Sequence, residues 1–97
     1  MHAQLRDDAV FILSSTCSVR PQEQQVVIYN SKTDELHLVP LPAYYLVQLC
    51  DGLNTVADLE KYCREATGAE APRAELEDFL LKLVGRGVLH EVQNQIQ

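Results

Sequence analysis

Residues 40–62 read PLPAYYLVQLCDGLNTVADLEKY, and this stretch predicts two helices joined by a tight turn. Pro42 suits the first turn of a helix, because its missing N–H would have had no partner there. Apolar residues then recur at i, i+3, i+4 and i+7, which is one face of a helix. They are Ala43, Leu46, Val47 and Cys50. Asp51-Gly52 should end this helix, since glycine best adopts the left-handed conformation of helix ends.

A second helix should run from Val56 to about Ala66. Thr55 followed by Asp58 resembles a capping box, in which a hydroxyl and a carboxylate satisfy backbone N–H groups that the helix leaves free. The side chains expected to be buried are Val56, Leu59 and Cys63, with Tyr62 at the margin. Two helices and a tight turn make a helix-turn-helix, which is a scaffold and does not by itself indicate a function.

The residues before this stretch predict a three-stranded antiparallel sheet. Its strands are Val10–Leu13, Gln25–Asn30 and Glu35–Val39. Ser14–Pro21, rich in Ser, Thr and Pro, is expected to be a loop. Val26 and Ile28 should face one side of the sheet, with Leu36 and Leu38 as their partners across the hairpin.

A third helix should follow from about Pro72 to Arg86, again with proline in its first turn. Its apolar stripe recurs at i, i+3, i+4, i+7 and i+8. The stripe is Leu76, Phe79, Leu80, Leu83 and Val84. Gly87 should end the helix, Val88–Val92 should add a short strand, and the polar residues 93–97 should be frayed. The fold class is therefore α+β, winged helix-turn-helix-like, in one domain with an ordered part of about residues 8–92.

The motif order resembles that of a known family. An apolar-x-Leu-Cys-Asp-Gly string at Val47–Gly52 and Thr-Val-Ala-Asp-Leu at Thr55–Leu59 are similar to the PqqD family, also called the RiPP recognition element. The resemblance runs from about Val10 to Val92. It implies a small winged-helix-like domain that binds the leader segment of a ribosomally made precursor peptide. One departure is Val39–Ala43, where two prolines replace the Leu-Asn-x-Thr-Ala entry of many members.

The charge of the chain and the length of its apolar runs limit the kinds of partner that it can bind. The 97 residues carry 14 acidic and 8 basic side chains, a net charge of −6. DNA-binding domains take most of their non-specific affinity from clustered Lys and Arg, and the chain has no basic run. We therefore expect no nucleic-acid partner. No apolar run of 18 residues and no signal peptide occur, so a cytoplasmic protein without a membrane partner is expected.

Catalytic and metal-binding patterns are missing from the sequence. Three cysteines, Cys17, Cys50 and Cys63, show no C-x-x-C spacing and are expected to be small buried hydrophobes rather than a redox pair. The histidines, His2, His37 and His90, are expected on a terminus, a strand and near the last element. We expect no enzyme activity, no metal and no cofactor. An iron–sulfur cluster, if the pathway uses a radical enzyme, would belong to another chain.

Peptide binding explains the predicted strands and helices better than catalysis does. An edge strand offers free N–H and C=O groups to another extended chain, and the resemblance implies a leader peptide that pairs with the third strand against the third helix. On that helix, Leu81 is either a groove floor flanked by Asp78 and Lys82 or part of a wide core stripe. Which face of the third strand points inward is left open. The residues assigned to peptide binding are Leu36, His37, Leu38, Val39, Ala74, Asp78, Leu81, Lys82 and Gly85.

The first hypothesis is thus a non-catalytic module that presents a precursor peptide to a separate modifying enzyme, a radical enzyme being one candidate. The alternatives are a winged-helix transcriptional regulator, for which the second helix offers only Lys61 and Arg64 as bases, and a purely structural subunit. A homodimer through an open sheet edge is also compatible with the sequence.

Overall fold

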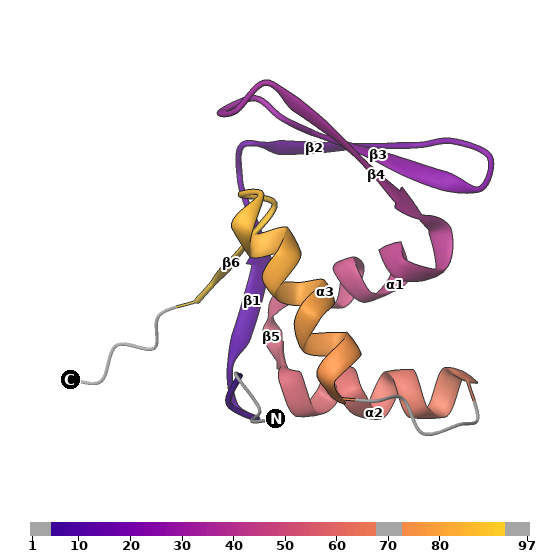
Figure 1. Cartoon of the computed structure of the whole chain (residues 1–97), viewed down its shortest axis with the longest axis vertical. Coiled ribbons are helices and arrows are strands. Elements are labelled where there is room, and N and C mark those ends of the chain that lie inside the picture. Colours follow the sequence, from indigo (N-terminus) through magenta and orange to yellow (C-terminus); the bar gives the residue numbers. More distant parts are fainter. Residues whose placement is uncertain (1–4, 68–72, 93–97) are drawn as a thin grey trace.

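The computed structural model describes residues 5–67 and 73–92. The described residues form strands and helices of an α+β fold (Figure 1). They are β1 Val10–Leu13, β2 Cys17–Pro21, β3 Gln25–Asn30, β4 Glu35–Pro40, α1 Leu41–Leu49, β5 Asp51–Thr55, α2 Val56–Thr67, α3 Arg73–Gly85 and β6 Leu89–Glu91. The predicted α+β class is confirmed, and the arrangement is compatible with a winged helix-turn-helix.

The strands form two antiparallel sheets rather than the single sheet predicted. One sheet has the order β2-β3-β4 and the other has the order β5-β1-β6. The expected loop Ser14–Pro21 contains β2, which pairs with β3 along its whole length. β1 instead pairs with two strands from far along the chain, β5 and β6, so its assignment to the hairpin sheet was wrong.

The β3–β4 hairpin has a register different from the expected one. Val26 lies opposite Val39 and Ile28 lies opposite His37, so these four side chains share the inward face. Leu36 and Leu38 are 66% and 64% exposed on the outward face. The prediction that they face Val26 and Ile28 was therefore wrong. A four-residue turn, residues 31–34, fixes Asn30 opposite Glu35, and every later pair follows from that one.

The predicted start of α1 at its prolines is confirmed, but its predicted end at Asp51-Gly52 was wrong, because α1 ends at Leu49 and Cys50 is its C-cap residue. Pro42 lies in the first turn of α1, and no side chain of the described residues caps that end of the helix. The Asp51 carboxylate accepts the backbone N–H groups of Leu53 and Asn54, at 2.9 and 3.2 Å, which turns the chain after the helix. Gly52 has φ +86 and lies within β5, an element that the sequence analysis missed.

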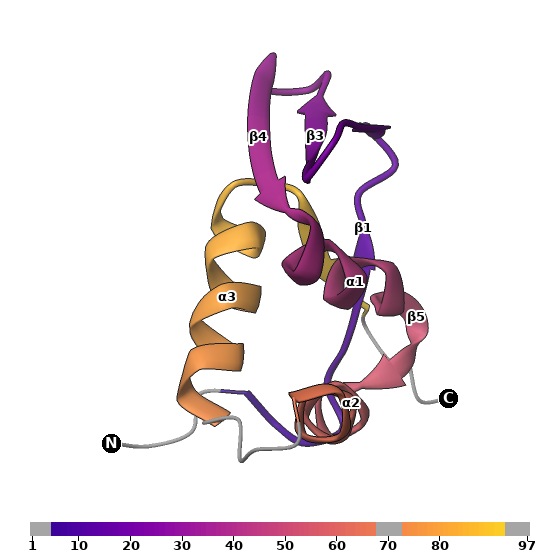
Figure 2. The same ribbon diagram turned by 90° about the vertical axis from the view of Figure 1, so that its right-hand side faces the viewer.

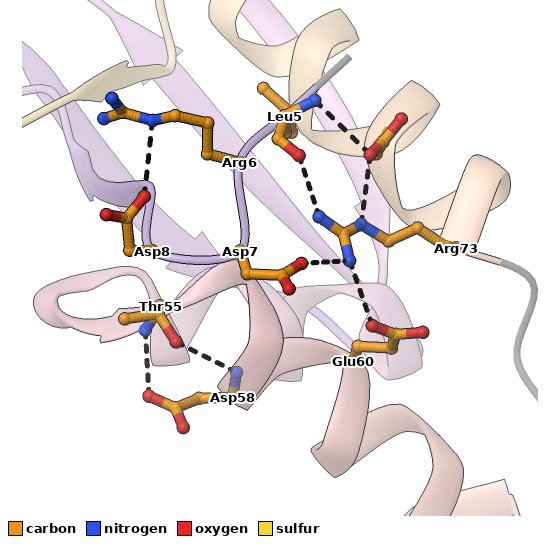
Figure 3. A network of polar contacts seen from close by, with 9 residues as sticks. Leu5, Arg6, Asp7, Asp8, Thr55, Asp58, Glu60 and Arg73 are labelled. Carbon is orange, nitrogen blue, oxygen red and sulfur yellow. Dashed lines mark hydrogen bonds and ion pairs between the residues drawn. The ribbon is translucent and has the colours of Figure 1, made fainter. Parts of the chain in front are cut away.

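The capping box of α2 is confirmed. The Thr55 hydroxyl accepts the Asp58 N–H at 3.1 Å, and the Asp58 carboxylate accepts the Thr55 N–H at 2.9 Å (Figure 3). Val56 and Leu59 are fully buried, Cys63 is half-buried and Tyr62 lies at the surface. This outcome matches the predicted amphipathic face.

α3 ends in a Schellman motif. The N–H of Gly87 donates to the carbonyl of Val84 at 3.0 Å, and the N–H of Val88 donates to the carbonyl of Leu83 at 2.9 Å. Gly87 has φ +75, as this motif requires. The predicted end of the helix at Gly87 is confirmed, and the short final strand is β6. Pro72 and residues 93–97 lie outside the described residues.

One core joins both sheets and all three helices. Its buried members come from β1, β3, β4, β6 and every helix; they include Phe11, Ile28, Val39, Val47, Leu59, Leu80 and Leu89. Figures 1 and 2 show the β2-β3-β4 sheet at one end of the molecule and α2 at the other, with α3 running between them. The C-terminal end of α3 is therefore the part of the helix nearest to the β2-β3-β4 sheet.

Candidate functional site

β4 is an edge strand whose outer side carries apolar residues. Among the described residues it pairs only with β3, so its other edge has free backbone N–H and C=O groups. His37 and Val39 point inward, with 7% and 4% of their surface exposed, whereas Leu36 and Leu38 point outward. The question that the sequence left open, which face of this strand is inward, is settled by this alternation.

The outward face of the sheet becomes more polar away from β4. Leu36 lies opposite Tyr29 and Leu38 lies opposite Val27. Beyond these pairs, β2 contributes Ser18 and Arg20 to the outward face. Exposed apolar surface is therefore concentrated at the β4 edge, and the opposite edge of the same sheet is polar.

Tyr29 is held on this outward face by the hairpin turn. Its hydroxyl donates to the carboxylate of Asp34 at 2.6 Å. This hydrogen bond, together with some desolvation and the negative charge, raises the pKa of Tyr29 above its usual 10.0. The ring therefore stays neutral and fixed beside Leu36 under ordinary conditions.

A recess of about 550 Å³ lies between β4 and the C-terminal end of α3. Glu35, Leu36 and His37 form one wall, and Gly85 and Arg86 form the other. A second recess, of about 760 Å³, shares Glu35, Gly85 and Arg86 with the first and extends beneath the β3–β4 turn. The end of α3 is thus surrounded by open surface on two sides.

His37 has an unusual position in the smaller recess. Its Nε2 atom is buried and has no hydrogen-bond partner among the described residues. The nearest acidic oxygen is Oε1 of Glu35 at 3.7 Å, which is beyond hydrogen-bonding distance, and Glu35 itself is 59% exposed. A buried polar nitrogen without a partner is rare in folded proteins and requires an explanation.

Asn30 holds the end of α3 against the hairpin sheet. Its amide oxygen accepts the Thr16 hydroxyl at 2.8 Å and the Lys32 N–H at 3.0 Å, while its amide nitrogen donates to the Gly87 carbonyl at 3.1 Å. Asn30 is 1% exposed, so these bonds are shielded from water. Asn30 was not predicted as a site residue; its signal in the sequence is an Asn at a strand end, directly before turn residues.

The residues predicted for peptide binding do not all lie together. Gly85 lies across the smaller recess from Leu36 and His37. Ala74 is exposed at the start of α3, the end that points away from the β2-β3-β4 sheet (Figure 2), and Asp78 is exposed near the middle of the helix. Lys82 is exposed one turn before the helix end, and Leu81 is half-buried but is not among the side chains that pack against the core. Two residues that were not predicted from the sequence also line the smaller recess: Glu35, the first residue of β4, and Arg86, directly after the end of α3.

The three cysteines are free thiols. Burial, with a smaller contribution from Asp51, raises the pKa of Cys50 to about 12, and burial also raises the pKa of Cys17 and of Cys63. In the described part of the chain, no three His, Cys, Asp or Glu side chains are grouped so that they could hold a metal ion. No helix in that part is both long and apolar enough to cross a membrane.

Two solved structures share this fold over a small part of their own length. "Structure of the heterocyclase TruD" superposes with a TM-score of 0.59 at 19% identity, over 92% of this chain and 12% of that chain. "Heterocyclase in complex with substrate and Cofactor" superposes with a TM-score of 0.59 at 18% identity, over 92% of this chain and 11% of that chain. No family model matches the sequence, and no curated protein matches it. At this identity the likeness shows the fold alone.

Proposed function

We propose that this chain is a non-catalytic recognition module that binds the leader segment of a ribosomally synthesised precursor peptide. The peptide adds as a strand to the free edge of β4, and the module presents it to a separate modifying enzyme in a peptide natural-product pathway. The observation that carries the proposal is the open β4 edge, with exposed Leu36 and Leu38 beside the recess at Gly85 and Arg86.

Strand addition fits the contrast between the two edges of the sheet. Natural proteins blunt edge strands that must stay free, with charged residues and prolines among the means. Proline does not distinguish the two edges, because β2 ends at Pro21 and β4 ends at Pro40. The outward face of β2 carries Ser18 and Arg20. β4 exposes two leucines along its edge instead, which adds side-chain contact area to the main-chain hydrogen bonds of an added strand.

The fold comparison supports a role beside an enzyme. A segment of the same fold makes up 12% of one heterocyclase chain and 11% of another, the second in complex with substrate and cofactor. Holding a peptide next to an active site raises its effective concentration there, and this needs no catalytic group in the module itself. The resemblance of Val47–Gly52 and Thr55–Leu59 to PqqD-like domains supports the same role.

A DNA-binding role has less support. In a winged helix-turn-helix the recognition helix usually brings basic residues to the phosphates. The exposed surface of α2 combines Lys61 and Arg64 with Asp58 and Glu65, in a chain of net charge −6. Such a helix has little electrostatic attraction for DNA.

The test is a titration of the full chain with the leader half of a precursor peptide encoded beside its gene, followed by backbone amide NMR shifts. We expect shifts on residues 36–39 and around Gly85 and Arg86. β5 is the internal control, because it is also a sheet edge and carries the 81% exposed Leu53. Shifts on α2 in the presence of DNA would instead favour a regulator, and a complex with the enzyme without any shift on β4 would favour a structural subunit.

A further inference from the structure

We propose that the bound peptide is recognised on both faces of the sheet, through a tripeptide pattern of apolar, oxygen-accepting and apolar side chains. The two apolar side chains pack on Leu36 and Leu38 on the outward face. The side chain between them, an amide or a carboxylate, accepts a hydrogen bond from His37 in the recess beside α3. This inference rests on the proposed strand addition at β4 and specifies the peptide that it would take.

The outward half of the pattern follows from strand geometry. Successive side chains of an added strand point to opposite faces of the sheet, so residues i and i+2 lie on one face about 7 Å apart. Residues placed opposite Leu38 and Leu36 would therefore both lie on the outward face. There they would extend the rows Val27–Leu38 and Tyr29–Leu36 and cover leucines that are 64% and 66% exposed. Directly opposite side chains in a ladder contact one another, so apolar residues fit these two places.

The inward half follows from the unsatisfied nitrogen of His37. Residue i+1 of the added strand would lie opposite His37 and point to the inner face, towards the recess lined by Gly85 and Arg86. Nε2 of His37 is buried and has no hydrogen-bond partner in the part of the chain that the structure describes. In the tautomer that carries the proton on Nε2, an oxygen from the peptide would accept this hydrogen bond, and leaving such an atom without a partner costs free energy in the unbound protein.

Charge in the recess decides which side chains can supply this oxygen. Arg86 is exposed there and favours a negatively polarised group, whereas Glu35, whose carboxylate lies 3.7 Å from Nε2, repels a full negative charge. Because Glu35 is 59% exposed, it can move into solvent when the peptide oxygen arrives. An sp² oxygen is the shared requirement, with the amide of Asn or Gln and the carboxylate of Asp or Glu as its two sources.

The test uses dodecapeptides selected from a random phage-displayed library on the intact chain, and their amide shifts on residues 36–39. We expect the enriched peptides to share the apolar, oxygen-accepting, apolar pattern. Replacing the central Asn or Asp by the isosteric Leu should weaken binding about five- to tenfold, because Nε2 of His37 is again left without a partner. Comparing Asn with Asp peptides then distinguishes the amide from the carboxylate.

A pair of protein variants tests the outward contacts. The double change Leu36→Ser and Leu38→Ser removes apolar surface without touching the core, and it should weaken binding at least about tenfold. Leu53→Ser changes a leucine on β5 that is even more exposed, at 81%, and this control should leave binding unchanged.

The outcomes separate this inference from the function on which it rests. If peptides shift the β4 amides but bind the double variant as tightly as the unchanged chain, and Leu81→Ser weakens them instead, the anchors lie towards α3. The two-faced recognition would then be wrong and strand addition would stand. If no selected peptide shifts β4 amides, strand addition itself would be contradicted.

Discussion

At the scale of single residues, the capping box of α2 gives a direct stability prediction. Thr55→Ala removes the hydroxyl that accepts the Asp58 N–H, and loss of such a cap costs about 1 kcal/mol. Urea unfolding of the variant should show this decrease in the free energy of unfolding. Thr33→Ala, at an exposed position in the β3–β4 turn, is the control and should change stability by less than about 0.5 kcal/mol. Equal effects of the two changes would contradict the role of the cap.

Cys50 gives a second prediction at this scale. Its pKa is raised from the usual 9.0 to about 12 by burial and by the nearby Asp51. A shift of three pH units (12 − 9.0) leaves on the order of a thousandfold less thiolate at neutral pH, and the thiolate is the reactive form. Iodoacetamide should therefore modify Cys50 of the native chain far more slowly than Cys17 or Cys63, as measured by mass spectrometry of the digested protein. Modification of Cys50 first would contradict the structure.

The same shift has a consequence for alkaline stability. Above pH 9 the Cys50 thiol of the unfolded chain loses its proton before the thiol of the folded chain does. The folded state then binds more protons than the unfolded state, so its stability falls as pH rises. We expect the contribution of Cys50 to be complete below about pH 9 and to decline between 9 and 12. Cys50→Ala should flatten this decline in urea unfolding measured at several pH values.

At the scale of secondary-structure elements, two glycines at the end of α3 form a matched pair. A Cβ at Gly87 would lie 3.0 Å from the amide nitrogen of Asn30, and the backbone there has φ +75. Gly87→Ala should cost about 1–2 kcal/mol because of this conformation. The new Cβ of Gly85→Ala would meet no atom of the described residues within 4 Å, and the change removes a helical glycine, so it should stabilise the chain by up to about 1 kcal/mol. Thermal unfolding distinguishes the two, and a stabilising Gly87→Ala would refute the Schellman assignment.

The elements also show how far the sequence can predict this fold. Helix limits were predictable because their signals are local, such as Pro42, the Thr55–Asp58 box and Gly87. Strand pairing was not, because β1 pairs with β5 and β6, and this choice depends on how distant parts of the chain pack. β2 was missed because Pro21 and its polar neighbours resemble a loop.

The candidate site was partly predictable for the same reason. The edge strand Leu36–Val39 was identified from its position in the hairpin. Which of its side chains point inward could not be predicted, because this depends on the register that the turn imposes. Arg86 and Glu35 reach the recess because of where α3 ends relative to β4. That relation is tertiary, and Asn30 maintains it through bonds to residues on both sides.

At the scale of the whole molecule, Arg73 connects the N-terminal segment with α2 and α3. Its guanidinium contacts Asp7 at 2.8 Å, Glu60 at 3.1 Å and Glu77 at 3.0 Å, and it donates to the Leu5 carbonyl (Figure 3). These acidic partners, with Asp7 first, raise the pKa of Arg73. One side chain thus holds three parts of the chain that are distant in sequence.

Arg73→Met should therefore destabilise the whole chain. Glu77 is 4% exposed and would lose this cation, so we expect a loss of about 2–4 kcal/mol in urea unfolding. The control is Arg6→Met, because the ion pair of Arg6 with Asp8 is 76% exposed on both sides and such pairs contribute less than about 1 kcal/mol. Similar effects of the two variants would show that the Arg73 contacts do not hold these segments together.

The central claim, that a peptide adds as a strand to β4, is tested most directly by backbone methylation of the peptide. In an antiparallel ladder only alternate residues direct their N–H groups at the neighbouring strand. A leader peptide that binds the chain is therefore methylated at one backbone nitrogen at a time, and its affinity is measured by calorimetry. We predict losses at every second position over the segment opposite residues 36–39, with little effect in between. Uniform tolerance of methylation along the peptide would contradict strand addition.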